Sequence, residues 1–575
     1  MTARQEYERW LSYEGLSPLQ REELLAIGAD EETVTFRFGR TMEFGTAGLR
    51  STMYLGPACM NEYTVAQATG GIAALVRKNG GAARGVAIAY DSRNHSKEFA
   101  TVCAEVLAAA GIRVYLFDGV RPTPELSFAV RALGCQAGIN ITASHNPKEY
   151  NGYKAYWEDG AQISPEQSHV VSEAISRIDV LGGALRMPLA EALETGLVTM
   201  LDEGFDQVYL RAVEGTAING DAIPSVTDEL KIVYTPLHGA GYRLVPEILK
   251  RAGLRHLYTV EEQMNLDGNF PTVKKPNPEY ADVFSLGIQI AERVGSDLVI
   301  ATDPDADRVG VMSRTKEGGF ATITGNQMGA LLLDYVIRAR RVAGRLTEGA
   351  YAVKSIVSTA LASKIAEAQG VKLYDVFTGF KFIGEVIKNH EKQGDGGEFI
   401  LGFEESYGYL FGSYARDKDA IGATLMIVEM TAYYRHLGMT LSDALEGLYR
   451  EYGLYKEGVL DVYMEGLDGI ARRQKVMNDL RENPPKTLGG VTVTEVTDHD
   501  RQTTISLSDG RKAPTGMAKS DVLYYTLAGG DKVIVRPSGT EPKIKFYFLC
   551  HGTDEESLAE KIAAYKKDAE GFTSL

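Results

Sequence analysis

Short apolar runs alternate with longer amphipathic stretches through the first three quarters of the chain. The pattern predicts a helix over 97–110 and buried strands at 86–90, 114–117, 136–141, 230–234 and 298–301. The first of these strands ends at Asp91-Ser-Arg93, and the same rhythm returns between 350 and 402. Strands separated by helices favour parallel or mostly parallel sheets with helices on their faces. We therefore expect three α/β domains.

The pattern changes from about residue 456. Strand candidates joined by short turns follow one another at 491–496, 503–507, 532–535 and 544–549. This arrangement predicts a C-terminal α+β domain. A chain of 575 residues is too long for one core. We place the domains at 1–212, 213–325, 326–455 and 456–575.

The clearest chemical signal follows a predicted strand. Residues 298–308 read Leu-Val-Ile-Ala-Thr-Asp-Pro-Asp-Ala-Asp-Arg, so an apolar run delivers Asp303, Asp305 and Asp307 at its end. Three carboxylates this close repel one another in a partly buried place, and a hard cation such as Mg²⁺ compensates for that charge. The pattern therefore indicates a divalent-cation site. A solvated acidic turn is the alternative.

A calcium loop of the EF-hand type is a second alternative, and the sequence tests it directly. A loop of that type beginning at Asp303 requires Gly at its sixth position and Glu at its twelfth. This chain has Arg308 and Arg314 there. Calcium sensing is thereby excluded, and Arg308 beside the carboxylates indicates a guanidinium that holds an oxyanion, phosphate above all.

Another strand-end loop offers a nucleophile. Residues 142–154 read Thr-Ala-Ser-His-Asn-Pro-Lys-Glu-Tyr-Asn-Gly-Tyr-Lys. A Ser/His hydrolase is one interpretation, but the G-x-S-x-G elbow is missing and the adjacent Ser144 and His145 need not face each other. The other is that Ser144 carries a phosphoryl group for metal and Arg to hold. His145 and Lys154 are candidates for cationic or proton-handling groups, and an ordinary turn is the remaining alternative.

Further loops supply groups for anions and hydroxyls. Segment 402–408, Gly-Phe-Glu-Glu-Ser-Tyr-Gly, follows an apolar run, and its carboxylates suit paired sugar hydroxyls. Segment 378–381, Thr-Gly-Phe-Lys, ends in a lysine that can reach an anion. Segment 533–543, Val-Ile-Val-Arg-Pro-Ser-Gly-Thr-Glu-Pro-Lys, lies between two predicted strands and gathers groups suited to phosphate: Arg536, Ser538, Gly539 and Thr540.

Composition narrows the classes of partner. A net charge of −16 argues against nucleic-acid or anionic-membrane partners, so attraction for a phosphate ester has to come from local Arg and Lys. The four cysteines show neither a paired framework nor C-x-x-C spacing, and we expect reduced thiols in a cytoplasmic protein. The N-terminus is charged, and no segment reaches about 18 uninterrupted apolar residues. We therefore expect no targeting or transmembrane segment.

Together these segments resemble the motifs of the α-D-phosphohexomutases, the family of phosphoglucomutases and phosphomannomutases. Thr-Ala-Ser-His-Asn-Pro, Asp-Pro-Asp-Ala-Asp-Arg, Phe-Glu-Glu-Ser and Arg-Pro-Ser-Gly-Thr-Glu-Pro-Lys occur in the family's order and span nearly the whole chain. Segment 44–50, Phe-Gly-Thr-Ala-Gly-Leu-Arg, is similar to the N-terminal signature. The length, with Phe-Glu-Glu-Ser-Tyr-Gly-Tyr and Thr-Gly-Phe-Lys, looks most like the long phosphoglucomutase branch that includes phosphopentomutases.

The resemblance implies a fold and a role for each matching residue. Four domains, three α/β with mixed sheets and one α+β, would surround a central cleft, with one motif loop from each. Ser144 would be the phosphoserine and would bind one Mg²⁺ per active site with Asp303, Asp305 and Asp307. Substrate would be held by Arg308, Lys381, Glu404 and Ser406, and its distal phosphate by Arg536, Ser538, Gly539 and Thr540. Arg50 and Lys154 would assist proton transfer, with His145 beside the nucleophile.

Three positions depart from the commonest family pattern. Phe403 stands where many members have Gly, and Ala47 where many have Asp, and neither change removes a functional group. Gly408 stands where some bacterial members have a His. Proton transfer by such a His is therefore not expected.

The implied reaction interconverts α-D-glucose 1-phosphate and glucose 6-phosphate through a phosphoserine enzyme and a glucose 1,6-bisphosphate intermediate, which also primes the enzyme. Alternatives within the family are a mutase for mannose or pentose phosphates and a glucose 1,6-bisphosphate synthase. Alternatives outside it are a metal-dependent sugar phosphatase and a catalytically silent sugar-phosphate-binding regulator. We expect small-molecule sugar phosphates as partners, and a monomer or homodimer.

Overall fold

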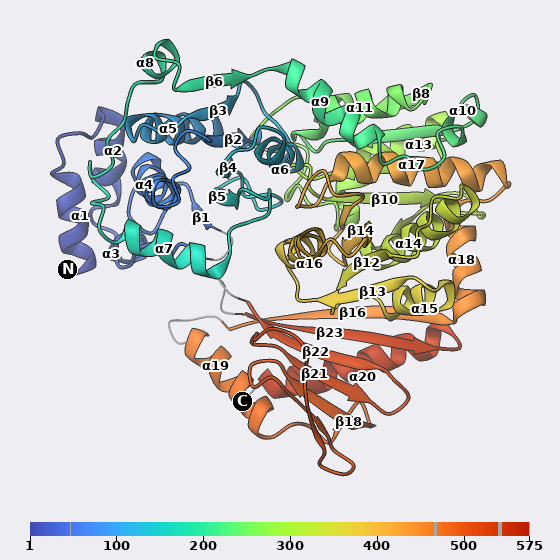
Figure 1. Ribbon diagram of the computed structural model, residues 1–575. Coiled ribbons are helices and arrows are strands. Elements are labelled where there is room, and N and C mark those ends of the chain that lie inside the picture. The colour runs from blue at the N-terminus through green and yellow to red at the C-terminus, as the bar shows by residue number, and fades with distance from the viewer. Residues whose placement is uncertain (46–47, 465–468, 539–542, 574–575) are drawn as a thin grey trace. The chain divides into compact units, whose positions relative to one another are not determined.

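The computed structural model describes residues 1–45, 48–464, 469–538 and 543–573 (Figure 1). The chain divides into two compact units, and each is described by itself. The first comprises Met1–Gly325, Arg338–Tyr351 and Gly379–Ser442, and the second comprises Asn326–Ile337, Ala352–Thr378 and Asp443–Leu575. The four domain boundaries expected from the sequence stay a prediction.

A six-stranded sheet organises the first part of the first unit. Its strand order is β1-β5-β4-β2-β3-β6. Strands β4, β2, β3 and β6 are parallel to one another, and β5 pairs antiparallel with both of its neighbours, β4 and β1. The strands are β1 (Leu49–Thr52), β2 (Val86–Tyr90), β3 (Val114–Phe117), β4 (Ala137–Ile141), β5 (Tyr150–Trp157) and β6 (Val198–Leu201). The strands predicted at 86–90, 114–117 and 136–141 are confirmed.

Helices cover both faces of this sheet. Successive side chains of a strand point to opposite faces, and accordingly Val86 and Ile88 of β2 join one apolar core while Ala87 and Ala89 join another. The helices are α4 (Glu62–Lys78), α5 (Ser96–Ala109), α6 (Thr123–Ala132), α7 (Pro165–Ile175), α8 (Leu189–Glu194) and α9 (Glu203–Glu214). The predicted helix over 97–110 is thus α5. This is the expected α/β/α layering.

Three helices at the N-terminus form a small core of their own, at the blue end of Figure 1. They are α1 (Ala3–Leu11), α2 (Pro18–Ile27) and α3 (Glu31–Phe38). Trp10, Leu24, Val34 and Phe38 pack together with Leu55, which follows β1. The three helices are therefore fixed to the segment that joins β1 to α4.

A second mixed sheet follows, with the strand order β11-β10-β9-β7-β8. Strand β7 runs parallel to β8 and β9, and β9, β10 and β11 form antiparallel pairs. The strands are β7 (Lys231–Thr235), β8 (His256–Thr259), β9 (Leu298–Thr302), β10 (Val309–Arg314) and β11 (Phe320–Ile323). The accompanying helices are α10 (Ala222–Ser225), α11 (Gly241–Arg251), α12 (Glu261–Met264), η1 (Ala281–Phe284) and α13 (Ser285–Val294).

A helix from much later in the chain completes this layer. Helix α17 (Ala420–His436) contacts α10, α11 and β10. Most of its residues are apolar, and its first thirteen residues are buried. A helix that is hydrophobic on all sides requires protein around it.

The third predicted α/β region is divided between the two units. Its strands are β12 (Ala350–Ser355), β13 (Lys372–Val376), β14 (Glu398–Glu404) and β15 (Gly408–Leu410). Its helices are α14 (Gly325–Val342), α15 (Ala360–Gln369), α16 (Phe380–Gln393) and α18 (Leu441–Tyr452). In the first unit, β14 and β15 form an antiparallel pair in which Glu404 lies opposite Gly408.

The C-terminal part of the second unit is an antiparallel sheet with two helices, which confirms the predicted α+β region. Its order is β16-β23-β22-β21-β18-β19-β20, with β17 beside β18, and the red strands lie side by side in Figure 1. The strands are β16 (Leu454–Tyr463), β17 (Thr487–Leu488), β18 (Val491–Asp498), β19 (Thr503–Ser506), β20 (Lys512–Pro514), β21 (Leu523–Leu527), β22 (Lys532–Pro537) and β23 (Lys543–Gly552). Helices α19 (Gly469–Glu482) and α20 (Glu555–Thr573) pack on them.

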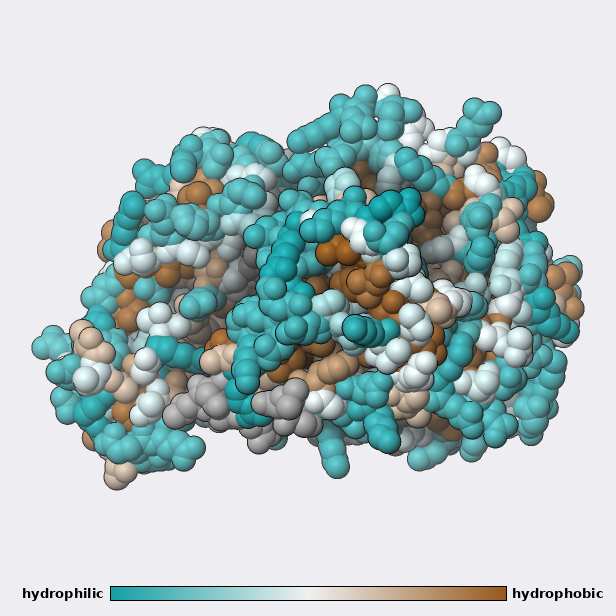
Figure 2. Space-filling view, turned by 90° about the horizontal axis from the view of Figure 1, so that it is seen from below, coloured by the Kyte–Doolittle hydropathy of each residue, from teal (hydrophilic) through white to brown (hydrophobic). Residues whose placement is uncertain are grey.

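A largely hydrophilic face and four free cysteines agree with what the amino-acid composition predicts. Hydrophilic side chains cover most of the face shown in Figure 2. All four cysteines are buried and free. Among the described residues, none of the helices has both the length and the apolar character that crossing a bilayer requires.

The environment of the Glu457 carboxyl group, in the second unit, leads us to predict that the stability of the protein depends on pH. Burial raises the pKa of Glu457 to about 7, although the Thr359 hydroxyl and Lys354 oppose the rise. Between pH 4.5 and 7 the folded state therefore keeps a proton that the unfolded chain loses, so stability falls as pH rises, by up to about 3 kcal/mol. Glu457→Gln, neutral at every pH, should match the wild-type melting temperature at pH 5 and exceed it by several degrees at pH 8. Equal pH dependence in scanning fluorimetry would contradict this.

Candidate active site

Three of the predicted motif segments are turns of β-hairpins in the first unit. Ser144 lies between β4 and β5, the three aspartates between β9 and β10, and Ser406 between β14 and β15. Each turn contains a non-glycine residue with positive φ: Ser144 (51°), Ala306 (49°) and Tyr407 (68°). This backbone region costs an L residue about 1–3 kcal/mol and persists only where the surroundings hold it. Antiparallel pairing on both sides supplies that restraint.

Ser144 is buried and its hydroxyl points at the acidic loop. The hydroxyl donates to Asp303 Oδ2 at 2.7 Å, and its Oγ lies 3.2 Å from His145 Nδ1. The Ser144 amide donates to Thr142 Oγ1 at 2.8 Å. The two strongest sequence signals, 159 residues apart, are thus in direct contact.

Arg93, just after β2, holds the Ser144 loop by its backbone. The Arg93 side chain is buried, with its Nε 3.3 Å from Asp91 Oδ2 and its guanidinium over the Phe270 ring at 5.1 Å. Asp91 in turn accepts from the Thr142 hydroxyl at 2.7 Å. The guanidinium donates to four carbonyl oxygens of the loop, those of Ser144 (2.5 Å), Asn146 (2.5 Å), Pro147 (2.9 Å) and Tyr150 (3.1 Å). Arg93 therefore fixes where Ser144 stands.

The three aspartates form a buried cluster suited to a divalent cation. One carboxylate oxygen from each lies within 4.8 Å of the others. Asp303 Oδ1 accepts the amides of Asp307 (3.1 Å) and Arg308 (2.9 Å). By contrast, Asp305 Oδ1 and Asp307 Oδ1 are buried without a hydrogen-bond partner among the described residues. Unpaired buried carboxylate oxygens are the ligands that Mg²⁺ takes, so these residues fit the predicted ion.

The electrostatics of the cluster lead to the same conclusion. Burial, with Asp305 and Asp307 beside it, raises the pKa of Asp303 well above its usual range. Burial also opposes the charge of Asp305, but the Lys154 ammonium outweighs it and lowers that pKa. A divalent cation would remove the repulsion that disfavours the charged form of Asp303.

Two buried lysines face the cluster. Lys154 Nζ, from β5, lies 2.7 Å from Asp305 Oδ2 and 3.2 Å from Asp307 Oδ2. Lys418 Nζ lies 3.2 Å from Asp307 Oδ2 and 3.1 Å from Asp417 Oδ1. Burial disfavours both charges, yet the carboxylates outweigh it and raise the pKa of each ammonium. Both lysines are therefore cations at neutral pH.

Arg308, His145 and Arg50 surround the nucleophile. Arg308 donates to Glu279 at 2.5 Å, and its Nε is 4.0 Å from Asp307 Oδ1. Arg50, which is exposed, donates to Asn146 Oδ1 at 3.0 Å in the Ser144 loop. Burial, together with the charges of Arg308 and Arg50, lowers the pKa of His145 well below its usual range. The imidazole is therefore neutral at pH 7.

The predicted sugar loop lies in the same unit. Glu404 is buried at the end of β14, and its Oε1 accepts the Gly379 amide at 2.6 Å, which brings it next to the Thr-Gly-Phe-Lys segment. Lys381 follows in the first turn of α16, half-buried, with its Nζ over the Phe382 ring at 5.2 Å. Ser406 is half-buried in the β14–β15 turn.

The structure explains why position 408 is glycine. A Cβ atom at Gly408 would lie 2.1 Å from Lys418 Cδ, so a side chain there would displace the Lys418 side chain. Lys418 thus occupies the space that a side chain at 408 would need, and it brings a cation to Asp307. Lys418 is a candidate site residue that the sequence did not reveal.

The predicted phosphate loop belongs to the second unit. Arg536 lies near the end of β22, and the Ser538 amide donates to the Lys543 carbonyl at 2.9 Å. Arg473 of α19 donates to the Ser538 carbonyl at 2.5 Å, which adds a cation that the sequence did not indicate. Gly539 and Thr540 lie outside the described residues.

Comparison with known families supports one assignment. Three consecutive domain models match, described as phosphoglucomutase/phosphomannomutase alpha/beta/alpha domain I at residues 41–181, domain II at 207–318 and domain III at 324–452. The chain belongs to the phosphoglucomutase/phosphomannomutase family. The α-D-phosphohexomutase resemblance inferred from the motifs is thereby confirmed.

Individual relatives within this family agree over nearly the full length. A phosphoglucomutase from Staphylococcus haemolyticus is 36% identical over 564 residues, covering 97% of this chain and 98% of that protein. One from Staphylococcus aureus is 36% identical over 529 residues, covering 92% and 93%.

Solved structures of the family share the fold. A putative phosphomannomutase from Thermus thermophilus has a TM-score of 0.68 at 22% identity, with 92% of this chain and 99% of that one covered. The phosphoglucomutase parafusin from Paramecium, in an open form, has a TM-score of 0.68 at 18% identity, with 93% and 96% covered. At these identities the likeness concerns the fold, and it agrees with the mixed-sheet α/β architecture predicted from the sequence.

The hydrogen bonds from Arg93 to the Ser144 loop lead to a testable prediction for this protein. Arg93→Lys keeps the charge but cannot donate to four carbonyls, so the Ser144 loop should lose its fixed position and kcat should fall roughly ten- to a hundredfold with little change in KM. The matched control is Arg84→Lys, since Arg84 also donates to two carbonyls, those of Gly134 and Cys135, outside the site. Steady-state kinetics and melting curves of both variants test this. A fall in kcat explained by loss of folded protein would contradict it.

Proposed function

We propose that the protein is a phosphoglucomutase that interconverts α-D-glucose 1-phosphate and glucose 6-phosphate through a phosphorylated Ser144. The observation that carries the proposal is the 2.7 Å contact between the Ser144 hydroxyl and Asp303 in a buried cluster of three carboxylates. A serine held at positive φ by Arg93 and aimed at a cation site is placed for phosphoryl transfer. The 36% identity to phosphoglucomutases over most of the chain supports glucose phosphates as substrates.

In the proposed cycle the phosphoryl group leaves Ser144 Oγ for the free hydroxyl oxygen of the hexose monophosphate. That hydroxyl loses its proton, Ser144 Oγ gains one, and glucose 1,6-bisphosphate results. The bisphosphate reorients and returns its other phosphoryl group to Ser144, which reverses the proton movements. His145 Nδ1, 3.2 Å from Ser144 Oγ, is placed to exchange the serine's proton, and Lys154 and Arg50 to assist on the sugar side.

Asp303, Asp305, Asp307 and Ser144 would hold one Mg²⁺. When bound, Mg²⁺ supplies positive charge that neutralises the phosphoryl oxygens in the loose transition state. Arg308, Lys154 and Lys418 add cationic groups of the chain itself around the same carboxylates. Together with the divalent ion, these three cations would outweigh the three aspartates and attract a phosphate ester to a protein whose net charge is −16.

The remaining residues would bind substrate. Glu404 would accept hydrogen bonds from the sugar hydroxyls, and Ser406 would accept or donate them. Lys381 would lie nearby. Arg536, Ser538, Gly539 and Thr540 of the second unit would hold the distal phosphate. Because the bisphosphate has to bind in two orientations, this set should recognise hydroxyls common to both. We place the enzyme in the cytoplasm, as a monomer or homodimer acting on free sugar phosphates.

The test is conversion of α-glucose 1-phosphate to glucose 6-phosphate with Mg²⁺, followed through NADPH formation by glucose-6-phosphate dehydrogenase. We expect fast conversion that a trace of glucose 1,6-bisphosphate stimulates. A panel with mannose 1-phosphate and ribose 1-phosphate compares kcat/KM values. A higher value for either sugar would move the enzyme to another branch of the family, and release of inorganic phosphate in place of isomer would indicate a phosphatase.

A further inference from the structure

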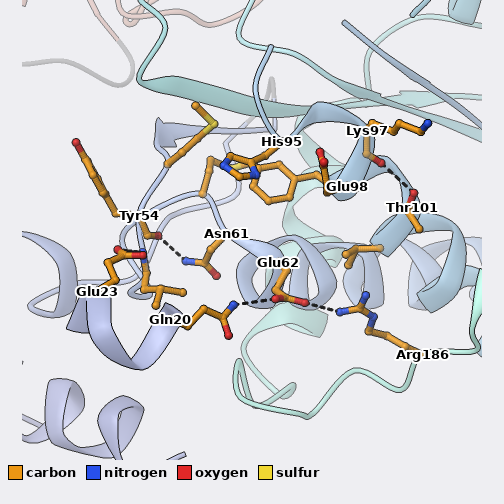
Figure 3. Close-up of a pocket in the computed structure, with 15 residues that line it drawn as sticks. Gln20, Glu23, Tyr54, Asn61, Glu62, His95, Lys97, Glu98, Thr101 and Arg186 are labelled. Atoms are coloured by element: carbon orange, nitrogen blue, oxygen red, sulfur yellow. Dashed lines mark hydrogen bonds and ion pairs between the residues drawn. The ribbon is translucent and has the colours of Figure 1, made fainter. Parts of the chain in front are cut away.

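A pocket of about 710 Å³ lies in the first unit, and none of the side chains that surround Ser144 and the aspartates lines it (Figure 3). Its walls come from α2, from the segment between β1 and α4, from the first turns of α5, and from Arg186. Pockets of roughly 300–1,000 Å³ hold small organic molecules. The pocket is therefore large enough for a ligand of its own.

The interior of this pocket is apolar and partly aromatic. Its apolar lining consists of Met53, Leu55, Met60, Phe99 and Val102. The His95 ring stacks on Phe99 with centroids 5.9 Å apart and an interplanar angle of 28°. Tyr54 stands across the pocket from His95 in Figure 3 and is 39% exposed. The Arg37 guanidinium covers one face of the Tyr54 ring at 4.0 Å, so the other face of Tyr54 and the exposed His95 ring are the surfaces that suit a flat aromatic ligand.

The polar rim is rich in hydrogen-bond acceptors. Glu62 accepts from Gln20 at 2.9 Å and from Arg186 at 2.8 Å, and Figure 3 shows it between the two. Glu23 accepts from Arg37 at 2.8 Å. Glu98 is exposed and, within the described residues, makes neither a hydrogen bond nor an ion pair. Three carboxylates thus line the pocket, and both oxygens of one of them, Glu98, are available to accept hydrogen bonds from a ligand.

The arginines at the rim are already paired with carboxylates, Arg37 with Glu23 and Arg186 with Glu62. Arg186 is committed to Glu62 and to Glu105, at 2.8 Å and 2.7 Å. The Lys97 side chain extends away from the other labelled groups in Figure 3. Glu98 is therefore the carboxylate that would act on a ligand: hydrogen-bond donors or positive charge next to it are favoured, and a phosphate group next to it is disfavoured.

We propose that this pocket binds an uncharged or cationic heteroaromatic molecule of about the size of a nucleoside. Its ring lies against His95 and Tyr54, and its hydroxyl or amino groups donate to Glu98. The site is separate from the catalytic residues, so it does not depend on the proposed function.

Adenosine, AMP and tryptamine serve as probes, with binding to the full-length protein measured by titration calorimetry and saturation-transfer NMR. We expect adenosine or tryptamine to bind, and AMP to bind at least about tenfold more weakly than adenosine. Thr101→Trp, a lining residue on α5, should fill the pocket and abolish binding. The matched control is Lys78→Trp at the exposed end of α4, which should leave binding unchanged.

A smaller change keeps the test valid if the tryptophan disturbs folding. Glu98→Gln removes the free carboxylate and should weaken tryptamine several-fold, whereas Glu194→Gln, exposed on α8, should not. Binding that survives both Thr101→Trp and Glu98→Gln would overturn the site. Equal affinity for AMP and adenosine would overturn the ligand class, and failure of adenosine and tryptamine to bind at millimolar concentration would overturn the proposal as a whole.

Discussion

Replacing Ser144 by alanine is expected to lower kcat for glucose 1-phosphate by at least about a thousandfold while the fold stays intact. In the proposed cycle Ser144 Oγ carries the phosphoryl group between the two half-reactions, so its removal interrupts both. The loss should fall on kcat, because the groups proposed to bind substrate remain. Alanine also fits the buried site, since it only removes the oxygen that donates to Asp303.

The measurement combines kinetics with intact-mass spectrometry. Wild-type protein incubated with glucose 1,6-bisphosphate should gain the mass of one phosphoryl group, and Ser144→Ala should not. Ser176→Ala, at an exposed helix end of the same unit, is the matched control and should behave like wild type. Substantial mutase activity in Ser144→Ala, or phosphorylation of that variant to the wild-type extent, would remove Ser144 from the proposed role.

Much of the site could be predicted because its chemistry lies in short segments that follow buried strands. The strand 298–302 is almost wholly apolar, so the aspartates after it are necessarily delivered at a strand end. The same holds for Ser144 after β4 and for Glu404 at the end of β14. Local sequence carries this information because strand and turn are adjacent in the chain.

What the sequence could not reveal is which distant segments complete each loop. Arg93 contacts carbonyls more than fifty residues away, and backbone carbonyls have no sequence signature. The acid and the arginine directly after the strand 86–90 were the available signal, since charged residues at the exit of a buried strand seldom lack a partner. Lys418 is a similar case, because its position depends on the absence of a side chain at Gly408.

Strand direction followed from the family resemblance and not from the strand pattern. Alternating strands and helices predicted mostly parallel sheets, whereas the resemblance implied mixed sheets, and β5, β10 and β15 each turn back against the strand before them. The hairpins are what place one residue per turn at positive φ, and none of these three residues is the glycine that usually marks such a turn. The departure from the local rule occurs at the candidate site, where strain is expected to be held by its surroundings.

Removing the cation site is the second change with a large expected effect, and Asp303→Asn separates function from stability. The variant should lose at least about a hundredfold in kcat at saturating Mg²⁺, because one of three carboxylate ligands becomes a neutral amide. Its metal-free melting temperature should equal or exceed that of wild type. Asp303 is the carboxyl whose ionised form burial and its neighbours disfavour, and an amide oxygen can still accept the amides of Asp307 and Arg308.

The two effects are read from melting curves and kinetics with EDTA and then with added Mg²⁺. Wild-type protein should lose activity in EDTA, regain it with Mg²⁺, and melt at a higher temperature when the ion is present, because a ligand that binds only the folded state stabilises it. Asp303→Asn should show no such rise. Asp297→Asn, just before the other end of the same strand and paired with Arg435, is the matched control: its melting temperature should rise with Mg²⁺ as that of the wild type does. A Mg²⁺-dependent rise preserved in Asp303→Asn, or wild-type activity unaffected by EDTA, would mean that the aspartate cluster is not the cation site.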